Sequence, residues 1–296
     1  LWFDAETSHS ELAVSKVGKQ VKNKMAEQGM EKWMRGLALI LIIAGMVAGC
    51  AAGNEKKQVA PDESILRIGV STNYPPLIFQ RDDDIVGVEA DLGRELAAHL
   101  GKKPVFVQVD WEDQVDRLVA GETDIIMAGM SVTEERMYKI NFSKAYFKTG
   151  QMVLVGNKPQ FQHLDNFPAL RAQVVAMTVG VVENTTGEVY VMENLNMARK
   201  VVRYPSSKAA VQALIEHKID MFVYDGVGVL MLEVANRKHG FKKIPLFLTD
   251  EYIAWGVRKN DQALLASANA FLDEIKRNGK LKKILSQWIP NISDLD

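Results

Sequence analysis

The chain has 296 residues, of which 47% are hydrophobic and 25% are charged, and these proportions are ordinary for a folded globular protein. They exclude collagen-like, coiled-coil and wholly disordered chains, and the length suggests two domains. The 36 Lys and Arg residues against 37 Asp and Glu residues leave a formal net charge of −1 and form no long basic run, so no nucleic-acid partner is expected.

The cysteine and histidine content limits the chemistry open to the side chains. One cysteine cannot form an internal disulfide, and the five histidines, at 9, 99, 163, 217 and 239, lack the spacing of metal ligands. No histidine follows a recognisable serine or cysteine nucleophile. We therefore expect no metal, no cofactor and no nucleophilic catalysis.

The single cysteine, Cys50, ends an apolar run over residues 36–49 (GLALILIIAGMVAG) that follows Lys32 and Arg35 and precedes the polar stretch NEKKQ. Basic residues, an apolar core and small residues, in this order, are typical of a secretory signal. The run is short for a helix that crosses the roughly 30 Å hydrocarbon core of a bilayer. An uncleaved transmembrane anchor and a buried core helix are the alternatives.

The segment VAGC resembles a bacterial lipobox. The resemblance implies that Cys50 is cleaved free, carries lipid such as palmitate, and tethers the protein outside the cytoplasm to the cell membrane or the outer membrane. Because the chain begins with Leu and opens on mixed polar residues, a true start at Met25, Met30 or Met34 is expected. The predicted divisions are a non-native or upstream extension (1–33), a lipoprotein signal peptide (34–50) and a tether (51–64).

From about Ile65 onward, short apolar strands alternate with amphipathic helical patterns, which is typical of parallel βαβ units and predicts an α/β fold. The predicted strands are 66–70, 103–109, 123–128, 151–156, 174–180, 200–204, 219–224, 244–248 and 252–257. The predicted helices are 91–100 and 112–120, each closed by a glycine, 206–217 with a serine cap, and 262–288 with a break near Gly279.

Two segments share one helix, turn and strand pattern. Residues 114–129 and 210–225 agree at three positions: Val115 with Val211, Leu118 with Leu214, and Asp124 with Asp220. Ligands bind beyond the carboxyl ends of strands in open α/β sheets, so residues 128–131 and 224–225 are candidate site residues. Two such sheets that face each other would form a cleft.

Several motifs follow one another in a fixed order between residues 66 and 288: LRIGVSTNYPPLIF, VGVEADLGRELAAHLG, DWEDQVDRLVAGETDIIMAGMSVTEER, INFSKAYFKTGQMVLV, VGVVENTTGEVY and KIDMFVYD. Together they resemble the bacterial extracellular solute-binding proteins of family 3, the receptors for polar amino acids that feed ABC uptake transporters. The resemblance implies a type II periplasmic-binding-protein-like fold, in which two lobes, each a mostly parallel sheet flanked by helices, are joined by a two-strand hinge. The implied boundaries are 65–151 plus 252–290 for lobe one, 155–250 for lobe two, and 150–153 and 250–253 for the hinge.

The resemblance also implies a site for the two charged groups of an α-amino acid, which need partners because enclosing an unpaired charge costs several kcal/mol or more. Arg136 and Ser131 in GMSVTEER match the family's carboxylate-binding pair. Thr186 in ENTTGEVY matches a second carboxylate contact at a predicted helix start. Asp225 and the carbonyl of Gly129 match the acceptors of the ammonium group. An exposed helical arginine, a capping threonine and a turn aspartate are the plain alternatives.

The side chain of the ligand would lie against Tyr74 and Trp111, which match positions where the family stacks aromatic rings. Ser71 stands where some relatives carry an aspartate for a polar or basic ligand, and Tyr224 is similarly placed, so both are possible residues of the pocket for the ligand side chain. No acidic residue is evident to hold a cationic side chain, so a neutral or aromatic ligand is favoured, although Glu183 is near enough in sequence to keep a cationic ligand open as an alternative.

The sequence departs from the family pattern at Asn184, where glycine is usual, although asparagine tolerates positive φ better than most residues. Some relatives with this fold are cyclohexadienyl dehydratases, whose catalytic carboxylate falls where this chain has Gly187, with Glu183 and Glu188 displaced from it. No enzyme is therefore expected. The prediction is a membrane-tethered, monomeric receptor that delivers an amino acid to ABC transporter permease subunits; an accessory sensor without transport, or a dehydratase-like enzyme, is the alternative.

Overall fold

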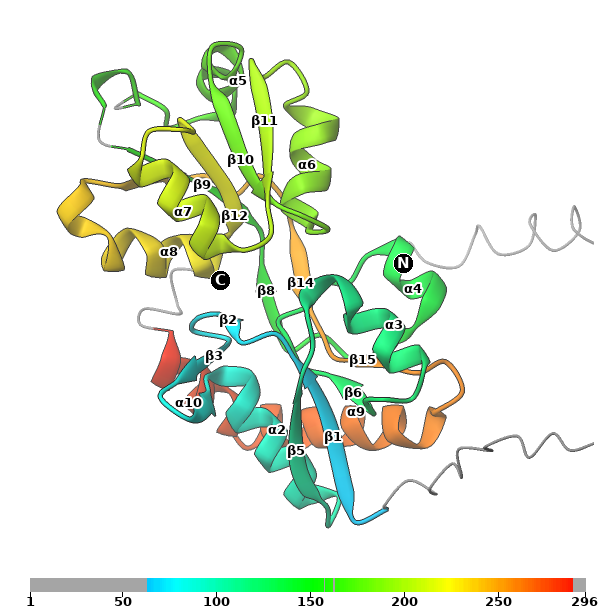
Figure 1. Cartoon of the computed structure of the whole chain (residues 1–296). Helices are drawn as coiled ribbons and strands as arrows, with labels where there is room; N and C mark the ends of the chain where they lie inside the picture. Colours follow the sequence, from blue (N-terminus) through cyan, green and yellow to red (C-terminus); the bar gives the residue numbers. More distant parts are fainter. Residues whose placement is uncertain (1–62, 157, 162, 290–296) are drawn as a thin grey trace, which may run out of the picture. The chain divides into compact units, whose positions relative to one another are not determined.

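The computed structural model describes residues 63–289, apart from residues 157 and 162. The predicted extension (1–33), the signal peptide (34–50) with its lipidated Cys50, and most of the tether (51–64) lie outside the described residues. Among the helices of the described part, none has both the length and the apolar character needed to cross a membrane. The described part forms two α/β lobes, each built on a five-stranded sheet (Figure 1).

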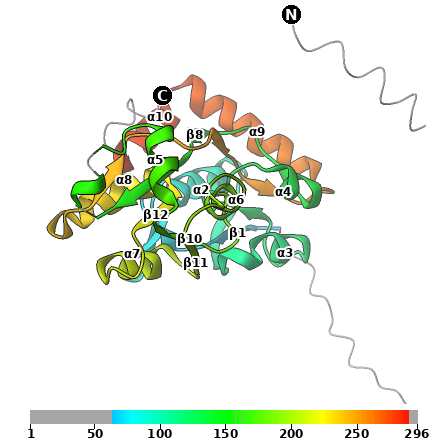
Figure 2. The same cartoon turned by 90° about the horizontal axis from the view of Figure 1, so that it is seen from above.

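Lobe one is built on a sheet with the strand order β5-β1-β6-β15-β7. Its strands are β1 (Ile65–Val70), β5 (Lys103–Gln108), β6 (Ile125–Ile126), β7 (Asn141–Phe142) and β15 (Gly256–Val257). Its helices are α2 (Val88–His99), α3 (Gln114–Val119), α4 (Glu134–Lys139), α9 (Gln262–Arg277) and α10 (Lys280–Trp288), and α9 runs along one side of the body in Figure 2. A small antiparallel sheet of β2 (Asn73–Tyr74), β3 (Ile78–Arg81) and β4 (Asp84–Val86) lies between β1 and α2 in the chain.

Lobe two is built on a sheet with the strand order β11-β10-β12-β9-β13. Its strands are β9 (Gln151–Val155), β10 (Thr178–Val182), β11 (Lys200–Tyr204), β12 (Met221–Asp225) and β13 (Lys242–Ile244). Its helices are α5 (Phe167–Val174), α6 (Thr186–Asn194), α7 (Ser207–Ile215) and α8 (Gly226–Ala235).

The two sheets repeat one plan. In lobe one, β1 pairs in parallel with β5 and β6, and β15 runs antiparallel to β6 and β7. In lobe two, β10 pairs in parallel with β11 and β12, and β9 runs antiparallel to β12 and β13. The sheets are therefore mixed rather than mostly parallel, because each takes in strands that arrive from the link between the lobes. The segments 114–129 and 210–225 hold equivalent places, α3 with β6 and α7 with β12.

The lobes are linked by two antiparallel strands, β8 (Phe147–Thr149) and β14 (Glu251–Ile253), which pair with Glu251 opposite Thr149. Both strands pass between the lobes in Figure 1. Gly150 joins β8 to β9, and a Cβ atom there would lie 2.0 Å from the backbone oxygen of Thr249. Only glycine allows the two chains to cross this closely.

Local signals account for several element ends. Helix α7 is capped by Ser206, whose hydroxyl accepts a hydrogen bond from the N–H of Ala209, as the sequence predicts. Helices α9 and α10 are separated at Gly279, which has a φ of 77°, a left-handed conformation that favours glycine. The predicted helix 112–120 is a 3₁₀ turn (Trp111–Asp113) followed by α3.

Two predicted strands are displaced. The segment 174–180 begins as the last turn of α5, which Asn166 caps, and its strand, β10, starts only at Thr178, where pairing with β11 begins. The segment 244–248 is not a strand beyond Ile244, because Pro245 has no N–H to continue the ladder with β9. Apolar periodicity marks both segments as buried but does not separate a helix end or a turn from a strand.

Two of the strands that lead to the cleft, β10 and β12, are almost fully buried, which fixes the residues at their ends. Strand β10 is buried throughout, and in β12 only the last residue, Asp225, is partly exposed. In lobe one, Trp255 is fully buried and packs on Phe271, with ring centroids 6.2 Å apart. The polar residues that follow these strands are held by well-packed lobes.

Candidate ligand-binding cleft

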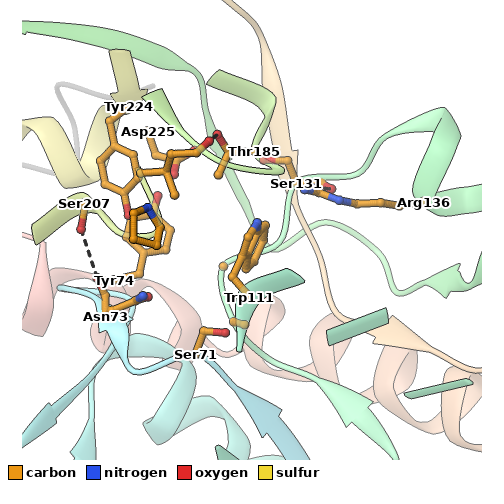
Figure 3. Close-up of a pocket in the computed structure, with 14 residues that line it drawn as sticks. Ser71, Asn73, Tyr74, Trp111, Ser131, Arg136, Thr185, Ser207, Tyr224 and Asp225 are labelled. Carbon is orange, nitrogen blue, oxygen red and sulfur yellow. Dashed lines mark hydrogen bonds between the residues drawn. The ribbon is translucent and has the colours of Figure 1, made fainter. Parts of the chain in front are cut away.

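A cavity of about 40 Å³ lies between the lobes, where the carboxyl ends of β1, β6, β10, β11 and β12 meet. This is the position that the sequence predicts for the site. The cavity is large enough for a few water molecules. It is lined by Ser71, Asn73, Tyr74, Trp111, Ala128, Gly129, Ser131, Arg136, Val182, Thr185, Pro205, Ser207, Tyr224 and Asp225 (Figure 3). Of the site residues named from the sequence, Thr186 is the one outside this lining, and its neighbour Thr185 takes that place.

Arg136 reaches the cavity from the first turn of α4, whose cap, Thr133, accepts a hydrogen bond from the N–H of Arg136. Its guanidinium donates to the carbonyl oxygen of Ser131 at 2.9 Å and lies over the ring of Trp111, 5.1 Å from the centroid. Burial lowers the pKa of Arg136, and the attraction of Asp225 and Glu251 opposes this shift. Within the described residues it forms no ion pair.

Asp225 ends β12 and faces the same cavity from lobe two. The side-chain amide of Gln151 donates to its Oδ1 at 2.8 Å. Burial, followed by repulsion from Glu251, raises the pKa of Asp225 to about 7, while the hydrogen bond from Gln151 and the charge of Arg136 act in the other direction. No ion pair reaches this carboxyl group from the described part of the chain. An unpaired guanidinium and an unpaired carboxyl therefore share one cavity.

Behind the cavity, the hydroxyl groups of Ser131 and Thr186 converge on one oxygen of Glu251. Ser131 Oγ donates to Glu251 Oε2 at 2.5 Å, and Thr186 Oγ1 donates to the same oxygen at 2.8 Å. The other oxygen of Glu251 accepts from Thr249 Oγ1 at 2.7 Å and from Gln151 Nε2 at 3.0 Å. A carboxylate of the linking strand β14 thus bonds a hydroxyl group of each lobe.

Gln151 and Glu251 belong to this network although the sequence does not predict them as site residues. Both are nearly fully buried, at 1% and 7% relative exposure, and both lie in the predicted hinge segments 150–153 and 250–253. A polar residue within each predicted hinge segment was the available signal, because a polar side chain that becomes buried there needs a specific partner.

Tyr74 and Tyr224 form an aromatic wall on one side of the cavity, with ring centroids 5.6 Å apart in an edge arrangement (Figure 3). The hydroxyl of Tyr74 is buried and has no hydrogen-bond partner among the described residues. Gly129 has a φ of 68°, and a Cβ atom there would lie 2.7 Å from the Tyr74 ring. The close approach of the chain to this ring requires glycine.

Glu89 supports Gly129 from within lobe one. Its Oε1 accepts the N–H of Gly129 at 2.8 Å, and its Oε2 accepts the indole N–H of Trp255 at 2.9 Å. Burial raises the pKa of Glu89 to about 7, and these hydrogen bonds counter part of that shift. Glu89 is fully buried and does not line the cavity, so its role is to position Gly129.

The lobes touch across the cleft through Asn184. The indole N–H of Trp111 donates to the carbonyl oxygen of Asn184 at 2.9 Å, and Arg136 Nη2 approaches the same oxygen at 3.4 Å. Asn184 has a φ of 59°, so it takes the left-handed conformation that its replacement of glycine suggests. A second, longer contact joins Ser207 Oγ to the carbonyl oxygen of Asn73 at 3.4 Å, drawn in Figure 3.

The hydroxyl of Ser71 is held within lobe one. It donates to the carbonyl oxygen of Val109 at 2.8 Å and accepts from Gln114 Nε2 at 2.9 Å. Ser71 therefore lines the cavity with a fixed orientation. In the described residues, no group of three or more His, Cys, Asp or Glu side chains is arranged to hold a metal ion.

Two α/β lobes, linked by two strands around a cavity at their strand ends, define a type II periplasmic-binding-protein fold. The chain belongs to the bacterial extracellular solute-binding proteins, family 3, whose family model matches residues 66–291. It is 25% identical to a probable histidine-binding protein of Neisseria gonorrhoeae, over 88% of this chain and 96% of that protein.

Solved structures of binding proteins have a similar fold. The fold is similar to a putative binding component of an ABC transporter from Wolinella succinogenes, complexed with lysine, with a TM-score of 0.72 and 26% identity over 78% of this chain and 97% of that chain. It is also similar to an ancestral amino acid-binding protein, AncCDT-1, described as a precursor of cyclohexadienyl dehydratase, with a TM-score of 0.68 and 28% identity over 77% and 96% of the two chains.

Proposed function

We propose that the protein binds an α-amino acid, or a close relative of one, between its lobes and delivers it to an ABC uptake transporter. The observation that supports this most directly is the pair formed by Arg136 and Asp225, two oppositely charged groups that line one small cavity and have no ion-pair partner in the described part of the chain. A zwitterion neutralises both at once, whereas either group alone would be left buried and uncompensated. The amino acid ligands named for the relatives agree with this assignment.

In this proposal Arg136 binds the carboxylate of the ligand through its planar fork, with Ser131 beside it. Asp225 and the carbonyl of Gly129 accept hydrogen bonds from the ammonium group. Tyr74 and Trp111 contact the side chain of the ligand, and Ser71 and Tyr224 border the same space. Thr186 acts through Glu251, while Thr185 faces the cavity.

Ligand capture requires the lobes to move, because the cavity is smaller than an amino acid and is enclosed from both sides. We place the division at 65–151 plus 252–290 for lobe one and 155–250 for lobe two, with bending at 150–153 and 250–253. A ligand that contacts both lobes favours the closed form by its difference in affinity for the two forms. A shift from mostly open to mostly closed needs a difference of roughly 10⁴-fold.

The attachment to a membrane is proposed from the sequence alone. The apolar run that ends in VAGC supports cleavage before Cys50 and a lipid anchor on that residue. The protein would then work outside the cytoplasm as a tethered monomer beside its permease.

A thermal-shift screen of the twenty amino acids tests the proposed function. A ligand at 100 times its dissociation constant adds about 2.7 kcal/mol of stability, which shifts the unfolding midpoint measurably. No stabilisation by any amino acid would contradict the proposal. Uptake of the ligand by cells with and without the gene separates transport from sensing, since a sensor module would bind the ligand without supporting uptake.

Catalysis on cyclohexadienyl acids is the second candidate, because AncCDT-1 is one of the structural relatives. The position that matches the catalytic carboxylate of the dehydratases is Gly187, where a Cβ atom would lie 2.6 Å from the side-chain oxygen of Gln151. This leaves no room for an acidic side chain unless Gln151 moves. We therefore expect no change in absorbance when the protein is incubated with prephenate or arogenate.

A further inference from the structure

A second, larger chamber of about 610 Å³ adjoins the cavity and shares four lining residues with it: Ser71, Asn73, Trp111 and Pro205. It is more open than the cavity and is lined by residues of both lobes. A ligand held between Arg136 and Asp225 would therefore extend past Trp111 into this chamber if its side chain were long.

The lining of this outer chamber is acidic. Five carboxylates face it, against one cationic side chain, Arg117: Asp110, Glu112, Asp113, Glu122 and Glu183. Arg117 is already paired, with Glu122 at 2.6 Å and Asp113 at 3.9 Å. Asp110 and Glu112 of lobe one and Glu183 of lobe two form no ion pair within the described part of the chain.

The inner site has an excess of negative charge as well. Arg136 is its one cation, whereas Asp225 borders the cavity and Glu251 lies directly behind it, bonded only by neutral donors. A zwitterion adds no net charge and leaves this imbalance in place. A ligand with a net charge of +1 brings the summed charge of the ligand, Arg136 and the ionised Asp225 and Glu251 to zero, even where its cationic end lies beyond the cavity.

The walls between the two charged regions suit an alkyl chain. Tyr74, at 6% exposure, and Trp111 present aromatic surface to the cavity, and the buried hydroxyl of Tyr74 has no hydrogen-bond partner among residues 63–289 as described. Of the four residues that line both the cavity and the outer chamber, Ser71 carries a hydroxyl group. That hydroxyl already donates to Val109 and accepts from Gln114. Recognition of a charged end must then come from the carboxylates further out.

We infer that the ligand is an amino acid with a long cationic side chain, whose charged end lies in the outer chamber among Asp110, Glu112 and Glu183. This inference rests on the proposed function. It reverses the preference for a neutral or aromatic ligand, which was based on the lack of an evident acidic partner, with Glu183 alone leaving a cationic ligand open. The sequence does not show that Asp110 and Glu112, more than seventy positions before Glu183, share a chamber with it.

Isothermal titration with L-arginine and L-citrulline, which have nearly the same shape and differ in the charge of the side chain, tests the inference. Exposed and partly buried ion pairs each contribute about a few-fold in affinity, so three carboxylates should favour arginine by roughly tenfold or more. The preference should shrink between low and high salt, because the chamber is open to solvent. Lysine and norleucine form a second pair with the same expected order.

Variants locate the effect. Glu183→Gln should weaken arginine binding roughly threefold to fivefold and leave citrulline unchanged. The control is Glu193→Gln, an exposed carboxylate on α6 outside both chambers, which should change neither. The triple variant Asp110→Asn, Glu112→Gln and Glu183→Gln should abolish the preference for arginine.

The outcomes separate the two proposals. If citrulline binds as tightly as arginine, or if Glu183→Gln weakens both ligands equally, the inference about charge is wrong while the proposed function stands. If none of the four compounds binds and the amino acid screen is also negative, the proposed function is wrong and this inference falls with it.

Discussion

Ionisation of Asp225 makes ligand affinity depend on pH. Burial, and then the charge of Glu251, raise the pKa of this carboxyl to about 7 in the ligand-free protein. The ammonium group of an amino acid needs the ionised carboxylate, so binding lowers that pKa and releases a proton. The affinity for L-arginine should therefore increase with pH and level off above pH 8.

The magnitude follows from the fraction of the carboxyl that is ionised before binding. With a pKa of about 7, about 1% of Asp225 is ionised at pH 5 and about 90% at pH 8. The apparent dissociation constant should be about 90-fold larger at pH 5 than at pH 8, a difference of about 2.7 kcal/mol in binding free energy. At pH 6, about 0.9 of a proton should be released per ligand bound.

Titration calorimetry at pH 5, 6, 7 and 8, in two buffers with different heats of ionisation, measures both the affinity and the proton release. Asp225→Asn should bind weakly and show little pH dependence. Glu89→Gln is a control for the pH dependence only: the pKa of Glu89 is also raised to about 7, and although its loss can change the affinity through Gly129, the dependence on pH should remain. A wild-type affinity that is constant from pH 5 to pH 8 would refute the reasoning, as would a pH dependence that Glu89→Gln removes.

The same groups act on the stability of the ligand-free protein in the opposite direction. The pKa values of Asp225 and Glu89 are raised in the folded state, so the unfolded chain loses these protons near pH 4 while the folded protein keeps them until about pH 7. Stability should fall as the pH rises from 4 to 7. Urea denaturation at pH 5 and pH 7.5 without ligand measures this, and equal midpoints would contradict the assigned shifts.

Substitutions at four further positions test the carboxylate clamp, the contact between the lobes, the aromatic wall and the membrane anchor. Arg136→Ala should reduce affinity by roughly 100-fold or more, because a ligand carboxylate would be left unpaired, and Arg136→Lys should lose less; tight binding by the alanine variant would disprove the clamp. Glu251→Gln should lower the free energy of unfolding by about 1–3 kcal/mol, since charge-assisted bonds to both lobes are weakened, and an unchanged urea midpoint would argue against this role. Gly129→Ala should cost about 1–3 kcal/mol and perturb the Tyr74 wall, with Gly101→Ala as a control that has positive φ but open space around it. Cys50→Ala should move the protein from the membrane fraction to the soluble fraction, and retention in the membrane would favour an uncleaved anchor.

The α/β class was predictable because short apolar strands alternate with amphipathic helices, and the two-lobed arrangement was predicted from the resemblance to the family. The cap at Ser206, the break at Gly279 and the equivalence of α3–β6 with α7–β12 each have a local sequence cause. The strand predicted at 174–180 is displaced because the last turn of α5 precedes its pairing with β11, and this pairing is nonlocal. The strand predicted at 244–248 ends early because Pro245 has no N–H to donate to β9.

The cavity lining was predictable at the carboxyl ends of strands, as for Gly129 and Asp225. The hydrogen-bond partners of the side chains behind the lining were not predictable. Whether Thr185 or Thr186 faces the cavity depends on how α6 begins, and the partner of Thr186 is Glu251, 65 positions away. That contact exists only because β14 pairs with β8 in one register, which short strands do not encode in their own residues.

The carboxylate of Glu251 has one more consequence for the chemistry of the cleft. Any incoming acid that uses the hydroxyl groups of Ser131 or Thr186 must displace a carboxylate that is covalently part of the chain and is therefore always present. The measured affinity then reflects the difference between the free energy with which the ligand carboxylate binds these hydroxyl groups and that with which Glu251 binds them. A substitution of Glu251 that frees these hydroxyl groups therefore tightens binding, although residue 251 itself does not contact the ligand.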